Sequence, residues 1–450
     1  MGLFDRLRGK DHPRVAFIGI DGVPFSLLSE YPEEFPNFAA LADEGSAGAI
    51  DSIVPPESSA CWPALTTGVN PGETGVYGFQ DREVGSYDAY VPMGRDVQAT
   101  RVWDRVTDAG RKATCDERPR DVPAAARRPA HGLWVPLAQR RQGCPSTVDL
   151  RDTLNEGNYR IDTDAKLGHD EDKTAFMEDA QKTLDRRYNA FERYLQEDDW
   201  DLFFGVFMTT DRVNHFLFKD YERDGKNKDA FFEFYRTVDD YIGRIRDTLS
   251  DDVTLVVASD HGFTSLDYEV HCNTWLEENG WLSYETDDHD SLGDIDADSK
   301  AYSLIPGRFF INLEGREPRG SVPQEEYEEV RDELKAELEA LEGPDGKKVA
   351  ERVVVKEDAF RGDHDDIAPD LVIIPNHGFD LKSGFRGHDD VFGVGPRNGM
   401  HSFDNATLYV DDPNAVIEDA DLYDITPTIL DLMEVDYART ELDGASLIQQ

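Results

Sequence analysis

Short runs of apolar residues recur along the chain and end in polar residues, a pattern that predicts buried strands. The runs are RVAFIGID (14–21), DLFFGVFMTTD (201–211), VTLVVASD (253–260), DLVIIP (370–375) and ATLYV (406–410). Because the runs are nearly continuous and do not alternate with polar residues, they are typical of parallel strands covered on both faces. Amphipathic stretches lie between them, the clearest at residues 176–195. Strands that alternate with helices predict an α/β fold: a doubly wound, mostly parallel sheet flanked by helices.

One region departs from this alternation. Residues 301–365 combine an extended pair, a charged helix and a further strand, and we interpret them as a small α+β insertion. The larger core would then comprise residues 11–300 and 366–450. Within it, residues 111–166 contain Pro and Arg but no clear periodicity, and we interpret them as a cap or lid.

The charge balance adds a constraint on the environment and on partners. The 450 residues include 93 Asp and Glu against 47 Lys and Arg, a net charge of −46 that is spread along the whole chain. An even acidic coat is typical of adaptation to a salty, haloarchaeal-like cytoplasm, where short Debye lengths make like charges tolerable; an ordinary acidic protein is the alternative. A surface this negative repels nucleic-acid polymers and anionic membranes.

Cysteine spacing and hydropathy point to the same compartment. The four cysteines are far apart and form no CxxC pair, which favours reduced thiols over a disulfide framework or a zinc ribbon. We find no secretory signal and no apolar stretch long enough to span a bilayer. We therefore expect a cytoplasmic protein with no membrane span. The sequence carries no signal for an oligomeric state.

Three of the predicted strands end in an aspartate, namely Asp21, Asp211 and Asp260. In a doubly wound sheet, ligands bind beyond the carboxyl ends of the strands. A buried, unpaired carboxylate costs several kcal/mol, and three at one edge would also repel one another. Because divalent cations relieve both problems, the pattern predicts a metal site.

Histidines accompany these aspartates. His215 follows Asp211 by four residues, so both would lie on one face of a helix; His261 is adjacent to Asp260, and His401 lies in a Gly-containing turn before the last predicted strand. Mixed Asp and His ligands suit zinc, and manganese less strongly. Each piece alone has an ordinary alternative, since D-x-x-x-H is often a helix-surface pair and a strand-terminal Asp often caps the next helix.

Ser58 and Ser59 are the candidate nucleophiles. They follow Pro55 and Pro56 and precede the predicted helix SACWPALTTG, whose N-terminus can present N–H groups to an anion such as phosphate. The alternative is that Ser58 simply caps this helix.

Taken together, these motifs resemble the alkaline phosphatase superfamily, in its type I phosphodiesterase/nucleotide pyrophosphatase branch. The resemblance rests on IGIDG, PPESSACWPALTTGVNPG, DRVNH, SDHGF, APDLVIIP and NGMH, and it extends over nearly the whole chain. It implies an alkaline phosphatase-like fold and two divalent metal ions. One would be held by Asp211, His215 and His401, and the other by Asp21, Asp260 and His261. Ser58, nine residues before Thr67 as in the family, would be the reactive ligand and would form a covalent phosphoserine with a small phosphate-ester substrate.

The sequence also departs from the family pattern. Ala60 stands where a Pro is common, Thr74 where a His is common, and Phe79 where nucleotide pyrophosphatases usually have an Asn that touches phosphate. No Arg near Ser58 matches the extra charge of a monoester, which favours diesters. Phosphomonoester hydrolysis, phosphonate hydrolysis, phosphoglycerate mutation and a non-catalytic metal-binding role remain alternatives. The candidates for substrate contact are Trp62, Tyr77, Phe79 and His271, of which Trp62 and Tyr77 fit the core equally well.

Overall fold

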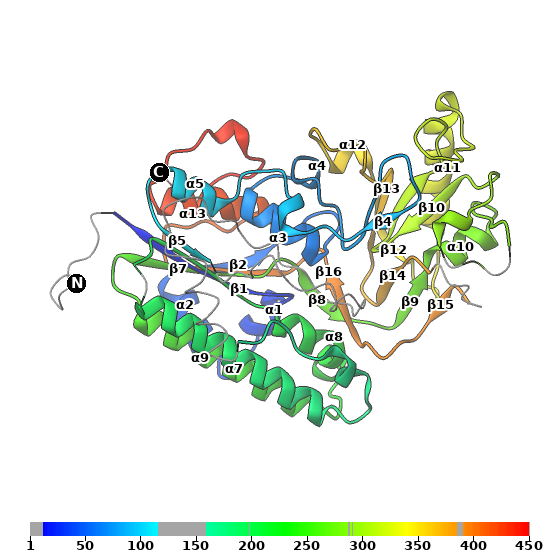
Figure 1. Ribbon diagram of the computed structural model, residues 1–450. Coiled ribbons are helices and arrows are strands. Elements are labelled where there is room, and N and C mark those ends of the chain that lie inside the picture. The colour runs from blue at the N-terminus through cyan, green and yellow to red at the C-terminus, as the bar shows by residue number, and fades with distance from the viewer. Residues whose placement is uncertain are drawn as a thin grey trace.

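A mostly parallel sheet forms the centre of the larger part of the molecule (Figure 1). The structure is a computed structural model that describes residues 12–115, 159–197, 199–286, 289, 291–384 and 390–449. Within these residues the sheet has six strands in the order β2 (Ser46–Ile50), β17 (Ala406–Val410), β7 (Val253–Ala258), β1 (Arg14–Ile20), β6 (Leu202–Phe207) and β5 (Ala113–Cys115). β1 runs parallel to β6 and β7, and β5 runs parallel to β6, whereas β17 is antiparallel to both of its neighbours.

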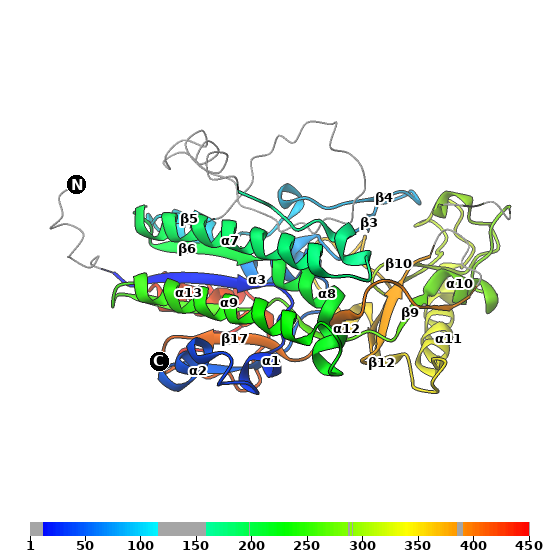
Figure 2. The ribbon, with the colours of Figure 1, turned by 90° about the horizontal axis from the view of Figure 1, so that it is seen from below.

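Helices cover both faces of this sheet because its strands are apolar on both sides. In β1, Val15 and Phe17 face one layer, while Ala16, Ile18 and Ile20 face the other. The helices on the second side are α1 (Phe25–Ser29), α2 (Pro36–Glu44), α7 (Thr174–Glu197), α8 (Thr209–Glu222) and α9 (Lys228–Thr248). Those on the first side are α3 (Ser58–Thr67), α5 (Val102–Asp108) and α13 (Ile425–Leu432). Figures 1 and 2 show these two layers, which confirm the predicted doubly wound architecture.

A second sheet lies at the end of the molecule remote from α5 and β5 (Figure 1). Its order is β10 (Ala301–Leu304), β11 (Arg308–Ile311), β13 (Leu371–Pro375) and β12 (Ala350–Val355), and all of its pairs are antiparallel. α10 (Cys272–Glu278) and α11 (Tyr327–Ala340) share its apolar core. The sequence placed the run 370–375 among the strands of the main sheet, and this assignment is wrong. A short apolar run predicts a strand but does not specify the sheet to which the strand belongs. Here Arg316 helps to hold β13 in the second sheet, because its Nη1 lies 2.8 Å from Oδ1 of Asp370, the residue just before β13.

Short strands and helices join the two parts. The strands are β3 (Asp81–Arg82), β4 (Ala89–Tyr90), β8 (Gly262–Ser265), β9 (Tyr268–His271), β14 (Phe379–Lys382), β15 (Phe392–Gly393) and β16 (Gly399–Ser402). The helices are α4 (Pro71–Thr74) and α12 (Lys356–Ala359). Buried ion pairs fix β3 to β11 and to the segment that follows it: Arg308 lies 2.5 Å from Asp81, and Arg82 lies 3.1 Å from Glu317.

Two expectations from the sequence concern membrane-spanning helices and the proposed cap. No helix among the described residues is long and apolar enough to cross a membrane. Of the proposed cap at residues 111–166, the part from 116 to 158 lies outside the described residues, whereas β5 at 113–115 is the edge strand of the main sheet.

Candidate metal centre

The candidate ligands come together at the carboxyl ends of β1 and β7. Asp21 follows β1 directly, Asp260 lies two residues beyond β7, and His261 precedes β8. The sequence analysis placed Asp211 at a strand end, but β6 stops at Phe207, and Asp211 lies in the first turn of α8. His401 is likewise in strand β16, opposite Phe263 of β8, and not in a turn.

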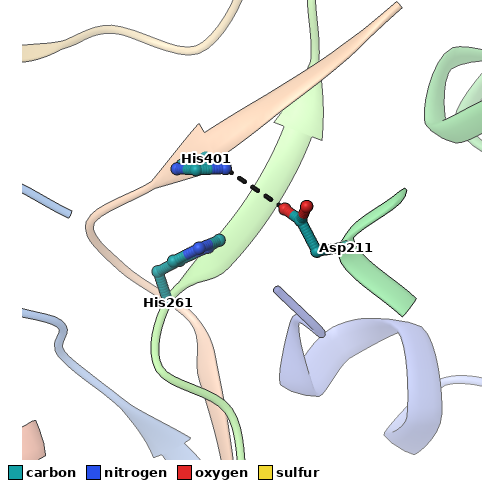
Figure 3. Close-up of side chains that lie close together, drawn as sticks. All are labelled: Asp211, His261 and His401. Atoms are coloured by element: carbon teal, nitrogen blue, oxygen red, sulfur yellow. Dashed lines mark hydrogen bonds and ion pairs between the residues drawn. The ribbon is translucent and has the colours of Figure 1, made fainter. Parts of the chain in front are cut away.

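One half of the site is formed by α8 and β16. Asp211 and His215 lie one helical turn apart on α8, as their spacing predicted, with Asp211 Oδ1 3.3 Å from His215 Nε2. His401 reaches across from β16, and its Nε2 lies 3.2 Å from Asp211 Oδ1 and 3.2 Å from His215 Nε2. Figure 3 shows the contact between His401 and Asp211, with the His261 ring beneath that of His401. The two imidazoles of His261 and His401 stack with centroids 3.8 Å apart.

The other half contains Asp21, Asp260, His261 and Ser58. His261 Nε2 lies 3.5 Å from Asp260 Oδ2 and 3.9 Å from Asp21 Oδ1. In two groups, Asp21–Asp260–His261 and Asp211–His261–His401, the potential ligand atoms all lie within 4.8 Å of one another. His261 thus lies between the two halves, and the structure brings all seven expected residues into one cluster.

Each histidine in the cluster is oriented by a backbone carbonyl. The Nδ1 atoms of His215, His261 and His401 lie 3.1, 2.9 and 3.1 Å from the carbonyl oxygens of Gly399, Gly262 and Pro56, respectively. A carbonyl can only accept a hydrogen bond, so each Nδ1 carries the proton and a neutral ring leaves Nε2 with its lone pair. Metal-binding histidines are commonly held in this way, with the ligating nitrogen directed into the site.

Burial sets the protonation of the carboxylates. It raises the pKa of Asp260 to about 7 and, together with the charges of Asp260 and Asp211, raises the pKa of Asp21 well above its ordinary value. Burial acts in the same direction on Asp211, but the charges of His215, His401 and Arg212 outweigh it and lower the pKa of that carboxyl. A low-dielectric pocket holding three carboxyl groups needs added positive charge for all of them to ionise.

The histidines respond to burial in the opposite sense. Burial lowers the pKa of His215 well below its ordinary value and lowers that of His261 to about 3. For His401, the contact with Asp211 and the nearby carboxylates outweigh burial and raise the pKa. His215 and His261 are therefore neutral, which is the form that binds metal.

The cluster fits divalent cations on an observation independent of the family. Asp260 Oδ2 is buried and has no hydrogen-bond partner among the described residues. Two imidazole Nε2 atoms, on His215 and His401, face each other at 3.2 Å, an arrangement that needs a proton or a cation between their lone pairs. Asp and His side chains are the ligands that zinc takes in such sites.

Ser58 lies at the cluster and does not cap its helix through its side chain. It is the first residue of α3, while Glu57 holds the cap position without a side-chain hydrogen bond. Ser58 Oγ is 3.0 Å from His261 Nε2 and 3.4 Å from Asp21 Oδ1. The Oγ of Ser59, by contrast, is buried and has no hydrogen-bond partner in the described part of the chain. The two adjacent serines therefore have different surroundings.

Three supporting contacts were not identified from the sequence. Trp62 Nε1 donates to Asp21 Oδ2 at 2.9 Å, the backbone N–H of Gly22 donates to Asp260 Oδ1 at 3.1 Å, and Arg212 Nη1 lies 3.3 Å from Asp211 Oδ2. Two signals were available: Trp62 is one helical turn beyond Ser58, and Arg212 is adjacent to Asp211 in DRVNH.

The remaining candidates for substrate contact lie in different surroundings. Trp62 is buried and supports Asp21, and Tyr77 is buried against Phe360 with its hydroxyl donating to the carbonyl of His364, so both occupy core positions. Phe79 is partly buried beyond α4. His271 is buried at the end of β9, with its Nδ1 2.9 Å from the carbonyl of Asp390.

One known protein family matches most of the chain. The sequence profile of one family, described as type I phosphodiesterase / nucleotide pyrophosphatase, matches residues 15–404. Among curated proteins, none matches the chain.

Solved structures resemble the fold over nearly its full length. Murine ectonucleotide pyrophosphatase / phosphodiesterase 5 covers 94% of this chain, and 96% of that protein is covered, with 14% identity and a TM-score of 0.53. An inactive variant of the same murine protein was solved in complex with AMP. Phosphonoacetate hydrolase from Sinorhizobium meliloti 1021, in complex with phosphonoacetate, gives the same coverages, 15% identity and a TM-score of 0.58. At these identities the likeness concerns the fold.

Proposed function

The chain belongs to the type I phosphodiesterase / nucleotide pyrophosphatase family, whose members are phosphoric ester hydrolases, and from this premise we propose that it cleaves small phosphodiesters through a covalent phosphoserine at Ser58. The observation that carries the proposal is the position of Ser58 Oγ, 3.0 Å from His261 Nε2 at the edge of a buried Asp and His cluster. A serine hydroxyl needs such an environment to act as a nucleophile.

Two divalent cations would be held by this cluster. Asp211, His215 and His401 would bind one, and Asp21, Asp260 and His261 would bind the other, with Ser58 beside it. The mixed oxygen and nitrogen donors favour Zn²⁺, with Mn²⁺ as the alternative. When bound, the ions supply Lewis-acid stabilisation of the charge that develops on phosphoryl and leaving oxygens.

The chain's own residues would act in two steps. Ser58 gives up its hydroxyl proton to water and its Oγ attacks phosphorus; the new Oγ–P bond forms as one ester P–O bond breaks, and the leaving group departs with that oxygen. Water then attacks the same phosphorus, the Oγ–P bond breaks, the phosphomonoester is released with the water oxygen, and Ser58 Oγ regains a proton. Because α3 begins at Ser58, the positive end of its dipole lies next to the attacked phosphoryl group.

The charges around the cluster favour diesters over monoesters. A monoester brings one more negative charge, which a free cation at the site would have to match. Among the described residues, Arg212 is the guanidinium that hydrogen-bonds to the cluster, but it is only 3% exposed and is bound to Asp162 and Asp211. The charge of Arg397 also acts on His215, and it lowers the pKa of that ring. Nucleotide-derived or other small diesters are therefore the proposed substrates. The acidic surface of the chain supports location in a salt-rich cytoplasm. The same negative charge disfavours binding of nucleic-acid polymers.

Adjacent serines provide the test. We expect Ser58→Ala to lower turnover of bis-p-nitrophenyl phosphate by about 10³-fold or more while metal binding persists. Ser59→Ala is the matched control and should retain activity, since its hydroxyl has no partner among the described residues. Assays in high salt with Zn²⁺ or Mn²⁺ should show faster cleavage of the diester than of p-nitrophenyl phosphate. Full activity in Ser58→Ala would rule out the nucleophile, and preference for the monoester would overturn the substrate class.

A further inference from the structure

The side chain of Arg212 divides the two oxygens of Asp211 between different partners. Its Nη1 lies 3.3 Å from Asp211 Oδ2, whereas Asp211 Oδ1 lies 3.2 Å from His401 Nε2 and 3.3 Å from His215 Nε2. One oxygen therefore faces the imidazoles, and the other faces a guanidinium. A carboxylate without this second contact is free to rotate or to present both oxygens to one ion.

Asp162 holds Arg212 in this position. Arg212 Nε lies 3.2 and 3.1 Å from the two oxygens of Asp162, and Nη2 lies 2.8 Å from Oδ2. Such a fork fixes the plane of the guanidinium as well as its position. With Nε and Nη2 bound to Asp162, Nη1 is the nitrogen that points to Asp211.

The segment that carries Asp162 is in turn fixed by α7. Arg187, on α7, donates from Nη2 to the carbonyl of Ile161 at 2.5 Å and from Nη1 to the carbonyl of Val206 at 2.6 Å. Next to it, Arg160 binds Asp179 with contacts of 2.5 and 2.7 Å. A continuous set of contacts thus runs from α7 through residues 160–162 to Arg212 and Asp211.

We infer that Arg212, held by Asp162, is a positioning residue of the metal centre. It binds Oδ2 of Asp211 and so keeps Oδ1 of the same carboxylate directed at His215 and His401. At 3% exposed, Arg212 is too deeply buried to contact a substrate. Its charge also helps to lower the pKa of Asp211, but the contribution that we assign to it is the orientation of that carboxylate, which the Arg212→Lys variant separates from charge. This inference rests on the proposed binding of metal by the cluster.

Metal affinity is the measurement that tests the inference. We expect Arg212→Gln to weaken Zn²⁺ binding, measured by competition with a chromogenic chelator, about 10- to 100-fold, the usual cost of losing an outer contact to a ligand. The rise in melting temperature on adding Zn²⁺ should shrink accordingly, and Arg212→Lys, which keeps the charge without the fork, should recover only part of it. A purely structural role would instead lower the melting temperature equally with and without metal.

Arg223→Gln is the matched control. Arg223 ends the same helix and binds Asp267 through two contacts of 2.8 Å, but on the surface. If Arg212→Gln does not fold, Asp162→Asn carries the test, because it weakens the fork and leaves Arg212 in place. The inference would be overturned if the folded variant, Arg212→Gln or Asp162→Asn, bound Zn²⁺ with wild-type affinity. An equal loss of Zn²⁺ affinity in Arg223→Gln would overturn it as well. Absence of Zn²⁺ binding by the wild-type protein would instead refute the proposed function.

Discussion

At the scale of single residues, Trp62 and Trp103 provide a natural comparison. Both pack edge-on against Phe204, with centroid distances of 6.5 and 5.3 Å, respectively. Trp62 Nε1 donates to Asp21 Oδ2 at 2.9 Å, whereas the indole N–H of Trp103 is buried with no hydrogen-bond partner among the described residues. We therefore expect Trp62→Phe to weaken Zn²⁺ binding about 10-fold, because Asp21 loses the donor that orients it.

The comparison with Trp103→Phe separates orientation from packing. Both substitutions remove a similar volume beside Phe204 and should lower stability by comparable amounts through packing alone. Zinc titration of the two variants, combined with thermal unfolding, distinguishes the effects. Equal zinc affinity in both variants would mean that the hydrogen bond to Asp21 does not support the site.

Single residues also mark how much of the site the sequence could predict. Asp21, Asp260 and His261 were predictable because the end of a buried strand is a strong signal, and His215 because its spacing from Asp211 matches one helical turn. Arg212 and Trp62 were not recognised as supporting residues. Their contacts depend on how α8 and α3 pack on the sheet, which no local pattern encodes.

At the scale of elements, a carboxylate pair at the turn that leads into α13 makes stability depend on pH. Asp421 accepts the backbone N–H of Tyr423 at 2.8 Å, and the side chain of Asp424 accepts the N–H of Asp421 at 3.0 Å. Burial, and then the charge of Asp424, raise the pKa of Asp421 to about 6. The folded state therefore binds this proton more tightly than the unfolded chain does. The stability that the proton contributes is complete below about pH 4 and lost as the pH rises through about 6.

We accordingly expect Asp421→Asn to stabilise the protein at pH 7.5 by about 1 kcal/mol, with the difference shrinking toward pH 5. The amide oxygen can still accept the N–H of Tyr423, so the turn is retained. Urea unfolding at both pH values measures the change. Asp412→Asn is the control, since Asp412 likewise accepts the N–H of Asn414, at 2.8 Å, but on the surface. A stabilisation that does not vary with pH would contradict the assigned cause.

Elements also show where pattern reading failed. The helical periodicity at 176–195 identified α7, because one apolar face over several turns is unambiguous. The run 370–375 identified a strand but not its sheet, since its pairing depends on residues distant in sequence. The ion pair between Arg316 and Asp370 helps to hold β13 in the second sheet, and the buried pair of Arg308 and Asp81 attaches β3 to β11; ion pairs of this kind leave no periodic signal.

At the scale of the whole molecule, two opposing effects of the surface charges decide how salt changes stability: attraction within ion pairs and repulsion among the excess acidic residues. Exposed ion pairs such as Arg236–Glu34 and Arg223–Asp267 are present and would be weakened by salt. The chain nevertheless has 93 acidic against 47 basic residues, so even one-to-one pairing would leave 46 acidic residues without a basic partner. Mutual repulsion should therefore dominate, and screening should stabilise the folded state.

The resulting prediction is that the melting temperature rises with salt. Between 0.1 and 1 M KCl the Debye length falls from about 10 to about 3 Å, which removes most repulsion between exposed carboxylates. We expect a rise of about 3–5 °C, corresponding to about 3–5 kcal/mol in a chain of this length. Calorimetry in KCl and in NaCl at equal ionic strength should give the same rise, because screening does not distinguish these cations. A melting temperature that falls with salt would show that the ion pairs outweigh the acidic excess, and a rise in only one of the two salts would indicate specific cation binding.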